Sequence, residues 1–300
     1  MAGYLAPTYA ASLAHVGQPV HLEESDAWAI ARPIAGSGQL DLVGCYPLMA
    51  CRHWEHIVAD LHALAPQYVS FTMVSDPLGA YSQDMLAAAF PDLCRPFKKH
   101  FLVDLQGDYA AHFSSNHVRN ARKAHKALVI QRVAHPGETL DDWSRLYQHL
   151  IKRHAIRGAA AFSREAFVMQ LKTPGIVVYK AAMDEETVGM VLFYEMGGHV
   201  YYHLAAYTGA GYTNKASFGI FQQAFADFSA AGLSVVNLGG GAGLEENADD
   251  GLTRFKRGWA STTAPAYLCG RILDHEAYQK LLAEMPAGQD NFFPAYRVNY

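Results

Sequence analysis

The sequence predicts a mixed α/β (α+β) protein built as two halves, each a mostly antiparallel, twisted sheet flanked by helices. Strand-like and helical runs alternate along the chain, which favours a mixed fold over an all-helical or all-strand one. Asp184-Glu-Glu and Gly197-Gly join consecutive strands through connections that are too short for parallel strands. The element order occurs weakly in residues 1–135 and clearly in residues 136–300, without a sequence repeat, so we expect two domains with these limits.

The first half alternates short strands with helices, read from apolar residues at strand or helix spacing. The expected strands are Pro19–Leu22, Ala27–Pro33, Leu40–Tyr46, Tyr68–Val74 and Phe97–Leu105. The expected helices are Tyr9–His15, His53–Leu64, Ser82–Phe90 and a serine-capped helix from Ser114 to Lys126.

The second half opens with two helices, continues with a strand meander and closes with a helix. The expected helices are Leu140–His154, one starting near Ser163, Ala216–Ala231 and His275–Glu284. The expected strands are Ile176–Ala182, Thr187–Tyr194, His199–Tyr207, Ser234–Leu238 and Ala264–Ile272. Phenylalanines near helical spacing in Ala216–Ala231 predict a core-facing helix rather than a cofactor site.

The most informative segment is Asn237-Leu-Gly-Gly-Gly-Ala-Gly243, which Arg254-Phe-Lys-Arg-Gly-Trp259 follows closely. A buried strand stops at Gly239, Gly240 and Gly241, where the missing Cβ atoms permit close approach to the backbone. The next element begins after two aspartates and carries Arg254, Lys256 and Arg257. Backbone amides without neighbouring side chains, close to cations, can bind an anionic ligand. The alternative interpretation of the segment is a glycine-rich loop that precedes a solvated cationic helix.

A second basic feature lies on the helix that follows Ser114. Four cations are spaced i, i+3, i+4 and i+7, which places them on one stripe of the helix: Arg119, Arg122, Lys123 and Lys126. No acidic residue occurs between Asp108 and Glu138. Like charges on one face repel, and a polyanion such as tRNA, a nucleotide-linked substrate or the CoA phosphates would relieve this. The alternative is a solvated helix paired with acids from elsewhere.

Composition limits the protein class. With 300 residues, 51% of them hydrophobic and only 17% charged, the chain can bury a large core and is not a disordered or coiled-coil protein. A net charge of −4 argues against a general nucleic-acid coat, so we expect no DNA partner. Four cysteines without CxxC spacing, and no basic or apolar leader at the N-terminus, predict a cytoplasmic protein without a membrane segment.

No metal site is expected. The best of the fifteen histidines are His53 and His56, but no second ligand pair follows them at a zinc-like spacing.

Residues from about 95 to 285 resemble the FemABX-like branch of the GNAT acyltransferase superfamily, which has two GNAT-like halves in tandem. The matching segments are Val188-Gly-Met-Val-Leu-Phe-Tyr194, Tyr201-Tyr-His-Leu-Ala-Ala-Tyr207, Asn237-Leu-Gly-Gly-Gly241 and Gly251-Leu-Thr-Arg-Phe-Lys-Arg-Gly-Trp259. The basic segment from Ser114 to Lys126 is similar to the helix that begins the family's linking region.

The resemblance implies transfer of an acyl or aminoacyl group onto an amine, with aminoacyl-tRNA or an acyl thioester as co-substrate and no permanently bound cofactor. In tRNA-dependent members, the lysine that matches Lys256 lies in the acceptor channel and supports the charge that develops during transfer. The same resemblance implies an acceptor-channel role for the neighbouring Phe255.

One departure bears on the donor. CoA-dependent GNAT enzymes carry a Gln/Arg-x-x-Gly-x-Gly/Ala loop whose amides hold the pyrophosphate. The corresponding segment here is Ala206-Tyr-Thr-Gly-Ala-Gly211, which keeps the glycine spacing but has alanine at the leading position. Both acyl-CoA and aminoacyl-tRNA therefore stay open as donors.

Amine acylation needs a proton acceptor and donors for the oxyanion. His203 lies mid-strand and has a reference pKa that suits a base, and alternation places Tyr207 on the same face as an acid or orienting hydroxyl. A hydrogen-bonded core histidine is the alternative for His203, and a surface lysine is the alternative for Lys256. Lys215 precedes a helix N-terminus, where it can contact a phosphate or lie in an exposed loop.

The sequence thus predicts an acyl- or aminoacyltransferase that acts on a small amine-bearing acceptor. The donor-binding candidates are Arg119, Arg122, Lys123, Lys126, Lys215, Gly239, Gly240, Gly241 and Arg254. The alternative is a catalytically idle GNAT-like module that only binds a ligand or partner. Neither the acceptor nor the oligomeric state follows from the sequence.

Overall fold

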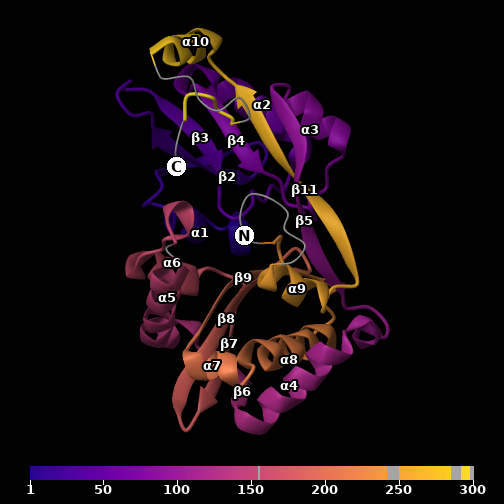
Figure 1. Cartoon of the computed structure of the whole chain (residues 1–300). Coiled ribbons are helices and arrows are strands. Elements are labelled where there is room, and N and C mark those ends of the chain that lie inside the picture. Colours follow the sequence, from indigo (N-terminus) through magenta and orange to yellow (C-terminus); the bar gives the residue numbers. More distant parts are fainter. Residues whose placement is uncertain (155, 242–249, 285–291, 298–300) are drawn as a thin grey trace. The chain divides into compact units, whose positions relative to one another are not determined.

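A computed structural model describes residues 1–154, 156–241, 250–284 and 292–297 (Figure 1). Ala242 and Gly243 of the glycine-rich motif, and Asp249, the first of the two aspartates before the cationic segment, lie outside the described residues. The chain forms two compact units. The central unit comprises Met1–Gly3, Lys98–Arg157 and Ser163–Ala264, and the terminal unit comprises Tyr4–Phe97, Gly158–Phe162 and Pro265–Tyr300. The limits of these two units are set by which segments pack together, and they differ from the expected domain limits. The expected domains, residues 1–135 and 136–300, stay a prediction.

The sheet of the central unit has the strand order β5-β10-β9-β8-β7-β6. The strands are β5 (Leu93–Asp104, from Lys98 onward), β6 (Val129–Arg132), β7 (Ile176–Met183), β8 (Glu186–Met196), β9 (His199–Tyr207) and β10 (Val235–Asn237). β10 is parallel to β9, and the other pairs are antiparallel. The hairpin between β7 and β8 turns at Asp184 and Glu185, which both have positive φ.

Helices cover both faces of this sheet. α4 (Ser115–Ala127) packs against α8 (Ala216–Ala230), which in turn packs on β6, β7 and β8. α5 (Leu140–His154) packs on β8 and β9 and against α6 (Arg164–Lys172). A short α7 (Gly209–Thr213) follows β9, and α9 (Gly251–Arg257) follows the glycine run. The core under α8 is rich in aromatic side chains, including Phe193, Phe221, Phe225, Phe228 and Trp259.

The terminal unit has the strand order β1-β2-β3-β4-β11, with β3 and β4 parallel. Its strands are β1 (Gln18–Leu22), β2 (Ala27–Pro33), β3 (Leu40–Gly44), β4 (Ser70–Val74) and β11 (Thr262–Ile272, from Pro265 onward). Its helices are α1 (Pro7–Ala11), α2 (Ile57–Leu64), α3 (Gln83–Ala89) and α10 (His275–Glu284). α2 and α3 contribute Leu61 and Leu86 to a core that also contains Phe71.

The predicted fold class is confirmed: both units are mixed α/β with mostly antiparallel sheets and flanking helices. β6 and α7 were not expected, because β6 is only four residues long and α7 only five. All four cysteines are free thiols. Among the helices that the structure describes, none has both the length and the apolar character needed to cross a membrane.

Candidate active site

Lys256 is the buried cation of the motif that follows the glycine run. Asp250 caps α9, where one carboxylate oxygen accepts hydrogen bonds from the amides of Leu252 (2.8 Å) and Thr253 (2.9 Å). This cap fixes the start of the helix, so that Thr253 and Lys256, three residues apart, both face inward. Arg254 and Arg257 are exposed. The alternative of a surface position therefore does not hold for Lys256.

The Lys256 ammonium lies at the end of the glycine run. Its Nζ donates a hydrogen bond to the carbonyl oxygen of Gly240 (2.6 Å) and lies 5.4 Å from the centre of the Tyr202 ring. The residue is 5% exposed. Burial and, to a smaller extent, the nearby Lys98 charge lower the pKa of Lys256 to about 7, although Asp250 acts in the opposite direction. At neutral pH this amine can therefore both carry a charge and exchange a proton.

The glycine run brings a second ammonium to the same place. Lys98, on β5, donates from Nζ to the carbonyl oxygen of Gly241 (2.9 Å). A Cβ on Gly240 would approach Lys98 Cδ to 3.0 Å, and one on Gly241 would approach Thr253 Oγ1 to 2.4 Å. Gly239 has φ +75°, which side chains disfavour. The glycines are therefore required for two cations to reach adjacent carbonyls.

The site lies where two parallel strands part. β10 pairs with β9 from Val235 opposite His199 to Asn237 opposite Tyr201, and β9 then continues to Tyr207 paired only with β8. Beyond Asn237 the chain follows β5 instead, because the amide of Leu238 donates to the carbonyl of Phe101 (2.8 Å). β9 and β10 therefore splay apart where the glycine run begins, and Lys256 lies beside this splay.

His100 is a site residue that the sequence analysis missed. Its Nδ1 lies 3.1 Å from Asn237 Oδ1, and the same oxygen accepts from the amide of Gly239 (2.8 Å). Burial lowers the pKa of His100 to about 4, and the Lys256 and Lys98 charges contribute to this shift. The imidazole is therefore neutral, and it donates from Nδ1 and keeps Nε2 as an acceptor. Nothing in the sequence distinguishes His100 from the other fourteen histidines.

His203 lies on the other face of the sheet, because β9 contains a bulge. Leu192 pairs with Leu204 and Phe193 with Tyr202, which leaves His203 without an opposite residue. The extra residue shifts the alternation. The ring of His203 contacts Tyr194 and approaches Gln170 of α6 (Nε2 to Oε1, 3.4 Å), and burial lowers its pKa to about 3. This placement favours the alternative of a core histidine.

Tyr207 packs with Tyr202 against the α8 core, so the prediction that it shares a face with His203 is wrong. The bulge is the physical reason, since it adds one residue between the two positions. Within the described part of the chain, the buried Tyr207 hydroxyl has no hydrogen-bond partner. Tyr207 also lines a cavity of about 270 Å³ together with His149, Leu150, Arg153, Thr208, Gly209 and Tyr212.

The segment that corresponds to the pyrophosphate loop is used for local packing. Thr208 caps α7. Its Oγ1 accepts a hydrogen bond from the amide of Gly211 (3.2 Å), and its carbonyl oxygen accepts one from the amide of Tyr212 (3.0 Å). A Cβ on Gly211 would approach the carbonyl oxygen of Val188 to 2.2 Å. Lys215 has φ +62° at the start of α8. The glycine at position 211 is therefore explained by packing of α7 on β8, and its amide is already bonded.

The basic stripe on α4 faces solvent. Arg119, Arg122, Lys123 and Lys126 are all exposed, opposite the face that carries the buried His117, Ala121 and Ala124. Arg119 donates to Asn116 Oδ1 (2.7 Å), and no ion pair joins any of the four to another described residue. The stripe is thus open to a ligand, but among the described residues no hydrogen bond joins it to Lys256.

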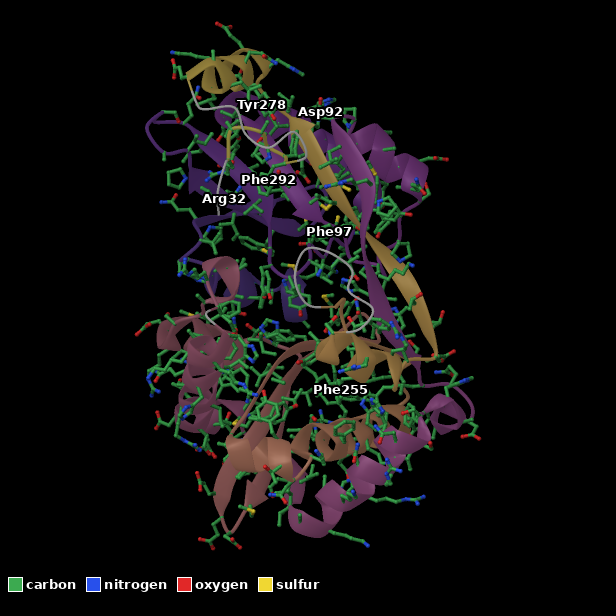
Figure 2. All side chains as sticks on the ribbon, in the orientation of Figure 1. Arg32, Asp92, Phe97, Phe255, Tyr278 and Phe292 are labelled. Atoms are coloured by element: carbon green, nitrogen blue, oxygen red, sulfur yellow. The ribbon has the colours of Figure 1, made fainter. Side chains whose placement is uncertain are left out.

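Phe255 lies in an aromatic cluster between α9 and α8 (Figure 2). Its ring centre is 5.2 Å from that of Phe218 and 5.1 Å from that of Phe221. The carbonyl of Phe255 accepts from His117 Nε2 (2.9 Å), whose ring lies against α9. Phe255 therefore anchors the helix that positions Lys256; the predicted role in an acceptor channel stays a prediction.

We expect Gly258→Ala to disturb this anchor. The added Cβ would lie 2.0 Å from His117 Cε1, and that ring is fixed by hydrogen bonds to Ser114 (2.6 Å) and Phe255. Overpacking of this kind costs about 1–3 kcal/mol, measured as the free energy of unfolding in urea. Gly251→Ala on the same helix is the control, since its Cβ meets nothing within 4 Å. Equal stability of the two variants would contradict the proposed packing.

Comparison with known proteins agrees with this geometry. Residues 112–257 match a family model described as an acetyltransferase (GNAT) domain. No curated protein matches the chain in sequence. The solved structure of FemX is similar, with a TM-score of 0.66 at 11% identity, covering 91% of this chain and 93% of that one.

Two further structures share the fold. One is the C-terminal domain of a putative lysylphosphatidylglycerol synthetase from Agrobacterium fabrum, with a TM-score of 0.60 at 15% identity over 91% and 90% of the two chains. The other is L-PGS from Bacillus licheniformis, with a TM-score of 0.59 at 18% identity over 87% of each chain. The family match places a GNAT acetyltransferase domain at residues 112–257 and supports an N-acyltransferase. The fold of the chain is the FemABX-like arrangement of tandem GNAT folds that it shares with the FemX structure.

Proposed function

We propose that the protein transfers an aminoacyl group from aminoacyl-tRNA to the amine of a small acceptor and so forms an amide. The observation that carries this proposal is the buried Lys256 ammonium, held beside Lys98 at the glycine-ended splay.

The chemistry requires an amine to attack the ester carbonyl of the donor. The carbonyl oxygen gains negative charge as the new C–N bond forms, and the bond to the ribose oxygen then breaks. Lys256 and Lys98 would stabilise the oxyanion. A lysine whose pKa is about 7 can also receive the proton that the attacking amine loses and return it to the leaving oxygen. Neutral His100 orients Asn237, which fixes the amide of Gly239 at the start of the glycine run.

Two observations support tRNA over CoA as the donor. In the segment that corresponds to the pyrophosphate loop, the amide of Gly211 already donates to Thr208 Oγ1. The exposed stripe on α4 offers four cations to a long polyanion. A lysylphosphatidylglycerol synthetase, by its name, makes a product that carries an aminoacyl group, and it shares this fold. The expected cytoplasmic setting, where such a donor is found, is part of the proposal.

Other predicted site residues have weaker support. Lys215, Arg254 and Tyr207 keep their proposed roles in donor binding or proton transfer, but among the described residues no side-chain hydrogen bond joins them to Lys256. A catalytic role for His203 is not favoured, because its ring packs against Gln170 and Tyr194 on the other face of the sheet.

The salt dependence of donor binding tests the stripe. Each phosphate neutralised contributes roughly −0.7 to −0.9 to the slope of log affinity against log salt. Replacing Arg122 and Lys126 with Gln should flatten the slope for aminoacyl-tRNA by about one to two units and leave turnover at saturating donor largely intact. Arg95→Gln with Lys280→Gln, two exposed cations of the terminal unit, is the matched control. An unchanged slope would remove the stripe from the donor site, and a shallow slope with tight CoA binding would favour the thioester donor.

A further inference from the structure

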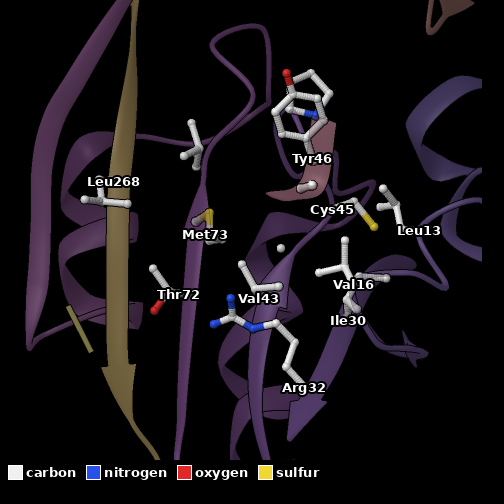
Figure 3. A pocket seen from close by; sticks show the side chains of 14 residues that line it. Leu13, Val16, Ile30, Arg32, Val43, Cys45, Tyr46, Thr72, Met73 and Leu268 are labelled. Carbon is white, nitrogen blue, oxygen red and sulfur yellow. The ribbon is translucent and has the colours of Figure 1, made fainter. Parts of the chain in front are cut away.

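The terminal unit contains a cavity of about 220 Å³ that the candidate active site does not use (Figure 3). It lies on the sheet face that presents Ile30, Val43 and Thr72, whereas neighbouring strand residues such as Phe71 belong to the core under α2 and α3. Its walls are mainly apolar, and they include Leu13, Val16, Ile30, Val43, Met73 and Leu268. An apolar lining with few polar groups is typical of a small-molecule site.

The strand register places two polar groups together in this lining. Val43 of β3 pairs with Ile30 of β2 on one side and with Thr72 of β4 on the other. Arg32 lies two residues after Ile30 and so on the same face of β2. Figure 3 shows the Arg32 guanidinium beside Val43, at the level of the Thr72 hydroxyl. These two side chains give the otherwise apolar cavity a polar end.

The Thr72 hydroxyl is unsatisfied within the described part of the chain. Its Oγ1 is buried without a hydrogen-bond partner, and the residue is 9% exposed. A buried hydroxyl without a partner is destabilising by about 1–3 kcal/mol, so such groups call for an explanation. A ligand atom that accepts a hydrogen bond would supply one.

Arg32 gives this end a positive charge. Its Nε donates to Asp41 Oδ1 (3.1 Å), but its Nη2 is 3.4 Å from Oδ2, and no described residue accepts from Nη1. Asp41 is shared, because Arg297 also donates to it through Nε and Nη2. One carboxylate thus faces two guanidinium groups, and Arg32 keeps donors for a further anion.

We propose that this cavity binds a small monocarboxylate with an apolar body, whose carboxylate accepts hydrogen bonds from Arg32 and Thr72. An engineered apolar cavity of roughly 150 Å³ holds benzene, so this larger cavity accommodates about nine non-hydrogen atoms. A six-carbon acid has this size. The site is separate from the proposed acyl transfer, and none of its lining residues belongs to the candidate active site.

Hexanoate is a suitable probe, with hexan-1-ol and hexylamine as matched neutral and cationic controls. Saturation-transfer NMR titrations of the full chain should show hexanoate binding at least tenfold more tightly than either control, because hydrogen bonds to a charged group are stronger than neutral ones. Hexan-1-ol binding as tightly as hexanoate would overturn the proposal, because the polar end would then contribute nothing.

Two variants locate the site. Thr72→Val keeps the side-chain shape, loses the hydroxyl and should weaken hexanoate about tenfold, while Thr262→Val on the exposed part of β11 should have no effect. Val16→Phe, at a half-buried position, should fill the cavity and abolish hexanoate binding. Unchanged affinity in either Thr72→Val or folded Val16→Phe would show that hexanoate binds elsewhere and would contradict the proposal.

Discussion

Lys256→Met is expected to lower the turnover of acyl transfer by about 10²-fold or more while the chain stays folded. The methionine keeps most of the apolar volume of the lysine stem, but it cannot stabilise an oxyanion or exchange a proton. Turnover at saturating substrates is the measurement, and Lys280→Met on the exposed face of α10 is the control. Wild-type turnover in Lys256→Met would show that the buried ammonium has no catalytic role.

The same variant has a stability signature. The pKa of Lys256 falls from 10.5 in the reference state to about 7 in the folded chain, so between these values the unfolded chain binds more protons. Wild-type stability should therefore rise with pH from about 7 to 10.5, by an amount on the order of a few kcal/mol. Lys256→Met lacks this group, so its stability relative to wild type should decline over that range. If the free energies of unfolding of wild type and Lys256→Met changed in parallel with pH, the lowered pKa of buried Lys256 would be contradicted.

Asp41→Asn is expected to cause the largest loss of stability, about 3–5 kcal/mol, because it leaves buried guanidinium groups without their counter-charge. Asp41 is fully buried and accepts from Arg32, Arg297 and the hydroxyl of Tyr296 (3.2 Å). Urea unfolding at neutral pH measures this loss.

The control for that measurement is Asp26→Asn. Asp26 pairs with Arg52 (2.9 Å) at the surface, where the two side chains are 22% and 49% exposed, so its loss should cost about 1 kcal/mol or less. Similar losses for Asp41→Asn and Asp26→Asn would contradict a special role of the buried carboxylate.

Local patterns in the sequence were sufficient to predict most elements. The helices Leu140–His154 and His275–Glu284 and the strand His199–Tyr207 have the expected limits, because their apolar spacing and capping residues are strong local signals. The glycine run was also read correctly as a strand end beside a cation. The glycines allow Lys98 and Lys256 to approach adjacent carbonyls. This could not be predicted, because Lys98 lies more than a hundred residues before the glycine run.

The remaining features of the site depend on tertiary structure. His100 becomes a site residue only because β5 pairs with β10 and so brings it to Asn237. The bulge at His203 breaks the regular alternation from which we predicted the sheet faces of His203 and Tyr207. No residue type in β9 indicates that a bulge is present. The spacing of Gly209 and Gly211 suggested a phosphate loop, whereas Gly211 is needed for contact with Val188.

Transfer of a labelled aminoacyl group decides whether the protein forms amides from aminoacyl-tRNA. Purified protein is incubated with aminoacyl-tRNA labelled in the amino acid and a panel of small amines, and with labelled acyl-CoA in parallel. We expect label to move from tRNA into a base-stable amide with wild-type protein, and about 10²-fold more slowly with Lys256→Met. Absence of amide formation from either donor across the panel, or equal rates for wild type and Lys256→Met, would contradict the proposed function.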